Sequence, residues 1–353
     1  MKRAVKALLA GAVLGRRAFW ANASRLGAMQ VLCYHRIADE IDPLGLAVSL
    51  AEFDWQMQTL AASAHLQAVT ATQFVDLWCG RCERGPRIPV LVSFDDGFRD
   101  NLTLAAPVLE RHSVPAILFA TTDVLRGLPP WYDLIEHLVA TGHGPALRQA
   151  ATDCGLPDLA GGSPGEAAHW VERLLALDGE RFRKAIDAVR ALPLPPPPAT
   201  RYLSPVDLHE WSAMGLEVGA HSCTHARLSS LAPADALWEM AESKHRLEAL
   251  LGRPVPCLAY PFGRLGDITP AHARAAETLG FSMAFSTVQG LNRAGEDAFM
   301  VRRKCVSSGL FTLAGGAFSE SLFLADLMGL GAELKHRVQT AMRGPHHSEA
   351  NAG

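Results

Sequence analysis

The sequence predicts an α/β fold built on a parallel sheet that closes into a barrel. Short apolar runs typical of strands alternate with helical patterns, and residues suited to catalysis follow the ends of strands. The expected strands are Gln30–Tyr34, Leu66–Val69, Pro89–Phe94, Ala116–Thr121, Leu216–Ala220, Cys257–Tyr260, Ser282–Ser286 and Phe299–Val306. The expected helices between them are Leu50–Ala62, Thr72–Trp78, Leu102–His112, Ala234–Leu251 and Pro270–Leu279.

Two adjacent carboxylates end the strand at Pro89–Phe94. Asp95 and Asp96 follow the apolar run directly, and Gly97 lets the chain turn away. Adjacent carboxylates repel each other, so the pair favours a site that supplies a cation or a shared proton. Taken alone, however, an Asp-Asp-Gly sequence is more often a simple turn.

A second polar segment follows the strand at Leu216–Ala220. His221 and His225 are four residues apart, which places them on one face if this segment is helical, a common arrangement for a transition metal. Alone, such a pair is more often solvated or packed in the core. Together, the two segments predict a hydrolytic metal site that carries its own base.

These two segments resemble the motifs of the polysaccharide deacetylases of the NodB-homology type, carbohydrate esterase family 4. The first family motif, Ser/Thr-Phe-Asp-Asp-Gly, matches Ser93–Gly97, and the second, His-Ser/Thr-x-x-His, matches His221, Ser222 and His225. The resemblance covers roughly residues 29 to 310. It implies a distorted (β/α)7 barrel, a metal bound by Asp96, His221 and His225, and Asp95 as general base.

The strand at Gln30–Tyr34 ends in Tyr34-His35-Arg36, which resembles the opening of the bacterial exopolysaccharide branch, including enzymes that act on poly-N-acetylglucosamine. In that branch the barrel is circularly permuted and the N-terminal strand supplies the general acid. The resemblance therefore implies that His35 is the acid and that Tyr34 lies at the substrate. The alternative for His35 is a structural histidine bonded within the core.

A fourth segment, Ala259–Gly263, resembles the family sequence Arg-Pro-Pro-Tyr-Gly. The resemblance implies that the backbone N–H of Phe262 stabilises the oxyanion and that Gly263 lets substrate approach closely. Tyr260 is expected to contact substrate as well. Ala259 replaces the family arginine that braces the base, and we expect Arg302 to reach the base instead. An ordinary salt bridge at a strand end is the alternative for Arg302.

Residues 131–198 interrupt the alternation and predict a helical insertion that ends in the polyproline segment Pro195–Pro198. The insertion either walls one side of a glycan groove or only packs against the barrel. Its first residues, Trp131 and Tyr132, are candidates for stacking on a sugar ring, and a core or hinge position is the favoured alternative. The barrel itself is expected over residues 29–315, followed by an amphipathic stretch and a disordered tail over 316–353.

The first 28 residues combine basic side chains with a short apolar core. An amphipathic segment on the inner membrane surface and a weak secretory signal both fit this pattern. Seven cysteines, an odd number, do not suggest a disulfide framework. We therefore expect a cytoplasmic or membrane-peripheral protein, with export as the alternative.

The formal net charge is −3, so no basic excess indicates a nucleic-acid partner. The predicted function is metal-dependent removal of N-acetyl groups from an amino-sugar glycan, in exopolysaccharide or envelope biosynthesis. One divalent ion is expected, zinc first, with cobalt, nickel and ferrous iron also compatible. The alternatives are hydrolysis of a non-glycan amide on the same fold and an inactive glycan-binding module.

Overall fold

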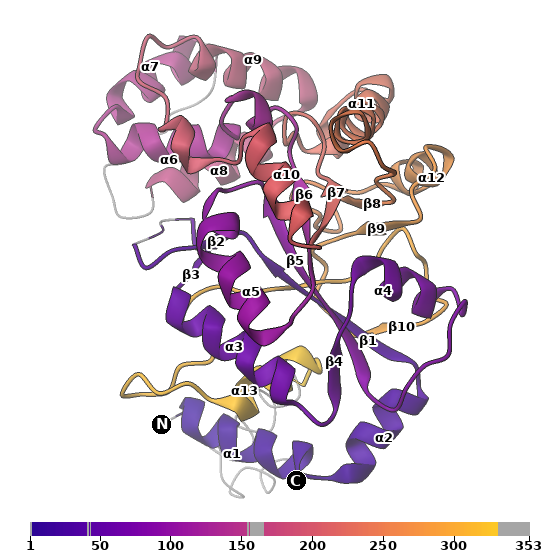
Figure 1. The fold of residues 1–353 in the computed structure, drawn as a ribbon. Helices are drawn as coiled ribbons and strands as arrows, with labels where there is room; N and C mark the ends of the chain where they lie inside the picture. The colour runs from indigo at the N-terminus through magenta and orange to yellow at the C-terminus, as the bar shows by residue number, and fades with distance from the viewer. Residues whose placement is uncertain (1, 41, 43, 154, 156–165, 331–353) are drawn as a thin grey trace, which may run out of the picture.

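The computed structural model describes residues 2–40, 42, 44–153, 155 and 166–330. Its centre is a nine-stranded sheet in the order β10-β1-β5-β6-β7-β8-β9, with β11 on β1 and β4 on β5 (Figure 1). Helices surround this sheet, so the predicted α/β class is confirmed.

The strands that carry the candidate site run parallel through the middle of the sheet. They are β1 (Ala28–Tyr34), β5 (Ile88–Asp96), β6 (Ala116–Ala120), β7 (Glu217–Ala220), β8 (Cys257–Ala259) and β9 (Met283–Phe285). Every residue of β1 and β5 is buried, as expected for strands covered on both faces. Parallel strands end at the same edge, so the residues after β1, β5, β7 and β8 converge.

The sheet curls until its two edges approach each other. Val301 forms a parallel bridge with Phe285 of β9, and β11 (Lys304–Cys305) pairs with β1 through Cys33↔Cys305. The segment from Val301 to Cys305 therefore links the last strand to the first. Four short strands complete the sheets: β4 (Leu66–Ala68), β10 (Asn292–Arg293), and the separate pair β2 (Arg36–Ile37) and β3 (Ala47–Val48).

Helices cover the outside of the sheet and begin where the sequence offers capping residues. They are α3 (Leu50–Ala62), α4 (Ala71–Trp78), α5 (Ala106–His112), α10 (Pro205–Ala213), α11 (Pro233–Leu251) and α12 (Pro270–Thr278). Ser49 caps α3, and Thr70 with Gln73 forms a capping box on α4. A π-helical turn, η1 (Asn101–Ala105), precedes α5 directly after the acidic motif.

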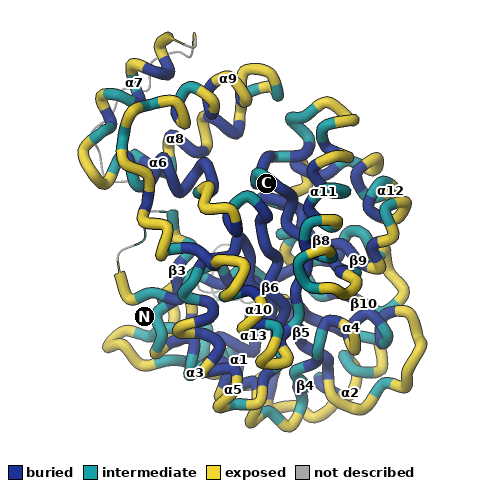
Figure 2. Tube along the Cα trace, turned by 45° about the horizontal axis from the view of Figure 1, so that its top comes forward, coloured by how far each residue is buried: buried dark blue, intermediate teal, exposed yellow. Residues whose placement is uncertain are grey.

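The insertion is a helical layer at one end of the molecule (Figure 1). It contains α6 (Trp131–Ala140), α7 (Gly144–Asp153), α8 (Glu166–Leu175) and α9 (Gly179–Arg190). Short 3-10 turns flank it and follow β7: η2 (Val124–Arg126), η3 (Ala199–Arg201) and η4 (Leu228–Ser230). Apolar side chains from all four helices form one cluster together with Phe98, Val124, Tyr202 and Ala226. The buried stretches of these helices are dark blue in Figure 2.

The N-terminal segment folds back onto the barrel as α1 (Lys2–Leu14) and α2 (Arg17–Arg25). Helix α1 packs against α13 (Glu320–Leu327), and Ala10 and Trp20 are buried in the main core. The part of the amphipathic stretch expected after Leu330 lies outside the described residues. Within the described chain, no helix combines the length and apolar character needed to cross a membrane.

Candidate active site

Four polar residues converge at the edge where β5 and β7 end. Asp95 and Asp96 are the last residues of β5, and His221 and His225 occupy the turn that follows β7. The expectation of a helical pair is wrong, because residues 221–227 form a turn with no helical residue. His221 continues directly from the strand, and His225 has a positive φ of 58°, which bends the second imidazole back toward the first.

The atoms of a candidate metal centre lie together in the buried interior. Oδ1 of Asp96 is 3.3 Å from Nε2 of His221 and 3.1 Å from Nε2 of His225. Tetrahedral ligands at about 2.05 Å from an ion lie about 3.3 Å apart, so this spacing fits a metal such as zinc. Oδ1 of Asp96 has no hydrogen-bond partner in the described structure, as expected for an atom reserved for a cation.

Groups behind the three ligands fix their orientation. Nδ1 of His221 lies 2.8 Å from the carbonyl oxygen of Ala259, which places the ring proton there and leaves Nε2 free as a ligand. The hydroxyl of Tyr132 donates to the second carboxylate oxygen of Asp96, and the indole of Trp131 donates to the carbonyl of His225 at 3.1 Å. The α6 helix of the insertion therefore supports the centre directly.

Glu239 of α11 holds the turn that carries both histidines. One of its oxygens accepts from the backbone N–H groups of Cys223 and Thr224 at 2.8 and 3.0 Å. The other accepts from the Thr224 hydroxyl at 2.6 Å. The side chain is almost fully buried. Nothing in the sequence pattern distinguished this glutamate from the other acids of its helix.

The base candidate Asp95 is braced by Arg303, not by Arg302. The Arg303 guanidinium donates to both oxygens of Asp95 at 2.7 Å and is fully buried. The expectation for Arg302 is wrong: this side chain is exposed and pairs with Glu296 at 2.7 Å. Neighbouring residues of an extended segment point to opposite faces, so only the second of the two arginines faces the interior.

The charges of the site favour ionised carboxylates. Burial opposes ionisation of Asp95, but Arg303 and then His221 outweigh it, so the pKa of this carboxyl lies below its usual range. Burial also opposes ionisation of Asp96, and His225 and His221 hold its pKa well below the usual range. Both groups are therefore anionic at neutral pH.

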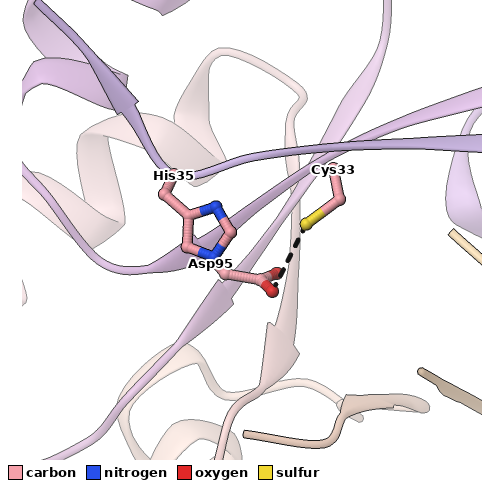
Figure 3. Close-up of side chains that lie close together, drawn as sticks. All are labelled: Cys33, His35 and Asp95. Carbon is pink, nitrogen blue, oxygen red and sulfur yellow. Dashed lines mark hydrogen bonds between the residues drawn. The ribbon is translucent and has the colours of Figure 1, made fainter. Parts of the chain in front are cut away.

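His35 lies close to Asp95 and Cys33 (Figure 3). It follows β1, is partly exposed, and lines the same cavity as Asp95. Its carbonyl accepts from the side chain of Asn101 in η1 at 2.8 Å, and Asp100 accepts from the Ile37 N–H at 3.1 Å. The acidic motif thus also positions the segment that carries His35.

Phe262 occupies the turn after β8 with a positive φ of 59°. Its ring lies edge-on to that of His225, with centroids 4.8 Å apart. No described residue accepts a hydrogen bond from its backbone N–H, which leaves this donor available at the cavity. Gly263 is buried and serves the turn, not the substrate: a Cβ there would lie 2.8 Å from the backbone nitrogen of Thr287.

Three aromatic residues expected at the substrate are in the core instead. Tyr34 is fully buried and donates to Gln56 at 2.6 Å, and Tyr260 donates to the carbonyl of Phe299 at 3.1 Å. Trp131 is likewise buried, with its indole committed to His225. The expectations of substrate contact for these side chains are wrong, because alternation along β1 and after β8 points the tyrosines inward.

The cavity above the site has a volume of about 170 Å³. Its floor holds Asp95, Asp96 and both metal-site histidines, and its walls come from three distant segments. Leu44 and Leu46 precede β3, and Val171 and Leu175 belong to α8. The insertion therefore walls the cavity. Arg264 belongs to the third segment, after β8, and its pair with Glu172 at 2.9 Å joins this segment to α8.

Strained backbone concentrates at this site. Among described residues other than glycine, positive φ angles occur at Asp96, Ser113, Ser222, His225 and Phe262. All but Ser113 belong to the motif turns around the cavity. Such conformations cost about 1–3 kcal/mol each and persist where the surroundings enforce them. Their clustering indicates a geometry maintained for chemistry.

Comparison with known proteins agrees with this geometry. A family profile described as polysaccharide deacetylase matches residues 182–284, which include both metal-site histidines. YxkH of Bacillus subtilis (strain 168), whose name assigns it provisionally to the polysaccharide deacetylases, is 22% identical over 303 residues, covering 86% of this chain and 80% of its own. This chain is therefore similar to the polysaccharide deacetylases in sequence.

Solved structures show the same NodB-like deacetylase fold. The Streptococcus pyogenes deacetylase PplD superposes with a TM-score of 0.56 at 16% identity, over 85% of this chain and 98% of its own. IcaB from Ammonifex degensii superposes with a TM-score of 0.51 at 21% identity, over 80% and 92%. These two solved structures therefore share the fold of this chain.

Proposed function

We propose that this protein removes N-acetyl groups from an amino-sugar glycan by metal-dependent hydrolysis. The observation that carries the proposal is the convergence, in one cavity, of a braced carboxylate, a ready metal centre and a partly exposed histidine. Asp96, His221 and His225 would hold the ion, and zinc suits their donor atoms best, with cobalt, nickel or ferrous iron as further fits. When bound, it would polarise the acetyl carbonyl and make water more acidic.

Asp95 serves as the general base in this proposal. Arg303 keeps it anionic and fixes both oxygens, so the carboxylate is ready to accept a proton from the attacking water. As the C–O bond forms, negative charge moves to the former carbonyl oxygen. In this proposal the backbone N–H of Phe262 donates a hydrogen bond to that oxygen.

His35 serves as the general acid. Breaking the C–N bond releases an amine, and an unprotonated amide anion is a poor leaving group. His35 lies close to Asp95 (Figure 3), and in this proposal it donates a proton to the departing nitrogen. The products are acetate and a free amino sugar.

The test is acetate release from N-acetylglucosamine oligomers by the metal-reconstituted protein. We expect release by the wild type and a loss of about 10²–10⁴-fold in kcat for Asp95→Asn and His35→Ala. A fully active His35→Ala variant would contradict the assignment of His35 as the acid, but it would not contradict the assignment of the metal ligands. No acetate from any glycan by a metal-loaded protein would contradict the proposal.

One observation favours a second candidate, a less polar amide. Much of the cavity wall is aliphatic: Leu44, Leu46, Val171 and Leu175. Sugars expose hydroxyl groups that such a wall does not satisfy. A panel of non-glycan N-acetyl compounds in the same assay separates the candidates. We extend the first candidate, the glycan deacetylase, to a role in exopolysaccharide or envelope biosynthesis. In that role α1 and α2 contact the inner membrane surface.

A further inference from the structure

A second group of metal-binding side chains lies beside the candidate metal centre. Cys33 and His35 are two residues apart at the end of β1, and Asp95 lies on the neighbouring strand β5. One donor atom from each lies within 4.8 Å of the others, and Sγ of Cys33 is 3.5 Å from Oδ2 of Asp95 (Figure 3). Figure 3 shows the imidazole and the thiol on either side of the carboxylate.

We infer that Cys33, His35 and Asp95 form a second cation site for thiophilic metals, and that filling this site stops turnover. The binding itself depends only on the three side chains. The inhibition rests on the proposed function, because it requires His35 and Asp95 to be acid and base.

The donor set determines which ions fit. A sulfur, an imidazole nitrogen and one carboxylate oxygen suit zinc and cadmium, whereas magnesium and calcium prefer oxygen ligands. Three protein donors leave a position for water or a further ligand. The thiol proton leaves to solvent as the sulfur–metal bond forms.

Arg303 makes this site weaker than the centre at Asp96. Its guanidinium contacts both oxygens of Asp95, so a second ion would lie near a fixed positive charge. Each carboxylate oxygen keeps a further lone pair, so coordination is still open. Among the described residues, no lysine or arginine contacts the ligands at Asp96, His221 and His225. The Asp96 centre should therefore fill first.

The rate of acetate release should therefore first rise and then fall as the metal concentration increases. The first equivalent completes the catalytic centre. The second occupies Asp95, which then cannot accept a proton, and His35, which then cannot donate one. Excess zinc or cadmium should inhibit, and excess magnesium should not.

The direct test is cadmium titration of the full-length chain, followed by calorimetry and by thiolate-to-metal charge-transfer absorption. Cys79, Cys82 and Cys154 are first replaced by serine, because Cys79 and Cys82 form an exposed Cys-x-x-Cys pair that would bind cadmium. We expect two equivalents to bind, with the absorption band on the weaker one. The Asp96 centre contains no sulfur, so the band reports the second site alone.

Cys33→Ser should bind one equivalent without the band. Cys257→Ser is the matched control, because Cys257 is an equally buried thiol on β8, a strand that carries none of the three donors, and its loss should leave the band in place. His35→Ala should weaken the second equivalent at least tenfold. One equivalent in the background protein, or a band that persists in Cys33→Ser, would overturn the inference.

The activity arm uses the same proteins. If the background protein releases acetate, Cys33→Ser should require at least tenfold more zinc for half-inhibition. An unchanged inhibition constant overturns the second half of the inference. If no acetate appears at all, the proposed function fails, while the cadmium titration still decides on the site.

Discussion

Arg302 and Arg303 are adjacent in sequence and differ completely in environment. Arg302 is exposed and pairs with Glu296, whereas Arg303 is fully buried against Asp95. The sequence indicated that an arginine from this segment would replace the missing family arginine, but it could not give the phase of the alternation. A one-residue shift in an extended segment exchanges the inward and outward faces.

We expect Arg303→Lys to lower kcat by about 10–100-fold, because lysine keeps the charge but cannot hold both oxygens of Asp95. Arg303 depresses the pKa of Asp95, so the substitution should raise that pKa. The acidic limb of the pH–rate profile should move to higher pH. Arg302→Lys is the matched control and should change neither kcat nor the limb.

The same depressed pKa has a consequence for stability. A carboxylate whose folded-state pKa lies below its unfolded value of about 4 stabilises the fold above that pH. This contribution disappears as pH falls through the folded-state pKa. Thermal denaturation of Arg303→Lys between pH 3 and 7 should therefore show a smaller loss on acidification than the wild type. An equal loss would contradict the assigned pairing.

Most residues that carry the chemistry were predictable, because short motifs follow strand ends. Asp95, Asp96, His221 and His225 were named from sequence, and the structure brings them together in one cavity. Tyr132 and Glu239 act behind the ligands and were not foreseeable in that role. They come from helices far along the chain, and their contacts depend on tertiary packing.

At the level of elements, the sequence predicted the parallel strands and the flanking helices well. Capping residues fixed helix starts, as Ser49 does for α3. The expected strand Phe299–Val306 instead forms one bridge at Val301 and the two-residue strand β11. This segment pairs with different partners on its two sides, and periodicity alone does not contain that information. The sequence pattern did not predict the π-helical turn η1 either.

Helix α11 stabilises the metal-site turn through Glu239. We expect Glu239→Gln to weaken metal affinity about 10–100-fold, because an amide replaces one of the two oxygens that accept from the turn. A competitive chelator titration measures this affinity. Glu242→Gln is the matched control on the same helix, since Glu242 is only partly buried and pairs with Arg246, not with the turn.

A Glu239→Gln variant with wild-type metal affinity would show that the turn keeps its shape without the buried carboxylate. Comparing metal affinity with melting temperature separates positioning from general destabilisation. If Glu239 positions the ligands, its substitution lowers the metal affinity. If it has only a structural role, the substitution lowers the melting temperature of the metal-free protein and leaves the metal affinity unchanged.

The whole molecule joins a barrel to a helical insertion through buried charge. At this junction Arg201 pairs with Asp133 at 2.8 Å and lies 3.6 Å from Glu136. Burial, with Asp133 nearby, raises the pKa of Glu136 to about 7. Between pH 4 and about 7 the folded protein therefore holds a proton that the unfolded chain releases.

This difference sets the sign of a pH effect on the whole molecule. The fold should lose stability as pH rises toward about 7, and Glu136→Gln should abolish that loss. We expect the variant to melt a few degrees above wild type at pH 8 and nearly with it at pH 4. Glu180→Gln, an exposed residue of the same insertion, is the control. A gain that is equal at both values would contradict the assignment.

The closure of the sheet by Val301–Cys305 also bears on how the protein is made. Asp95 precedes its partner Arg303 by 208 residues. At about 5–20 residues per second, a ribosome needs roughly 10–40 s to synthesise that interval. During this time Asp95, which is next to Asp96 in the chain, lacks the guanidinium that it pairs with in the folded protein. The repulsion between them should hold the central strands in a loose state, and the braced base should form only after the closing segment leaves the ribosome.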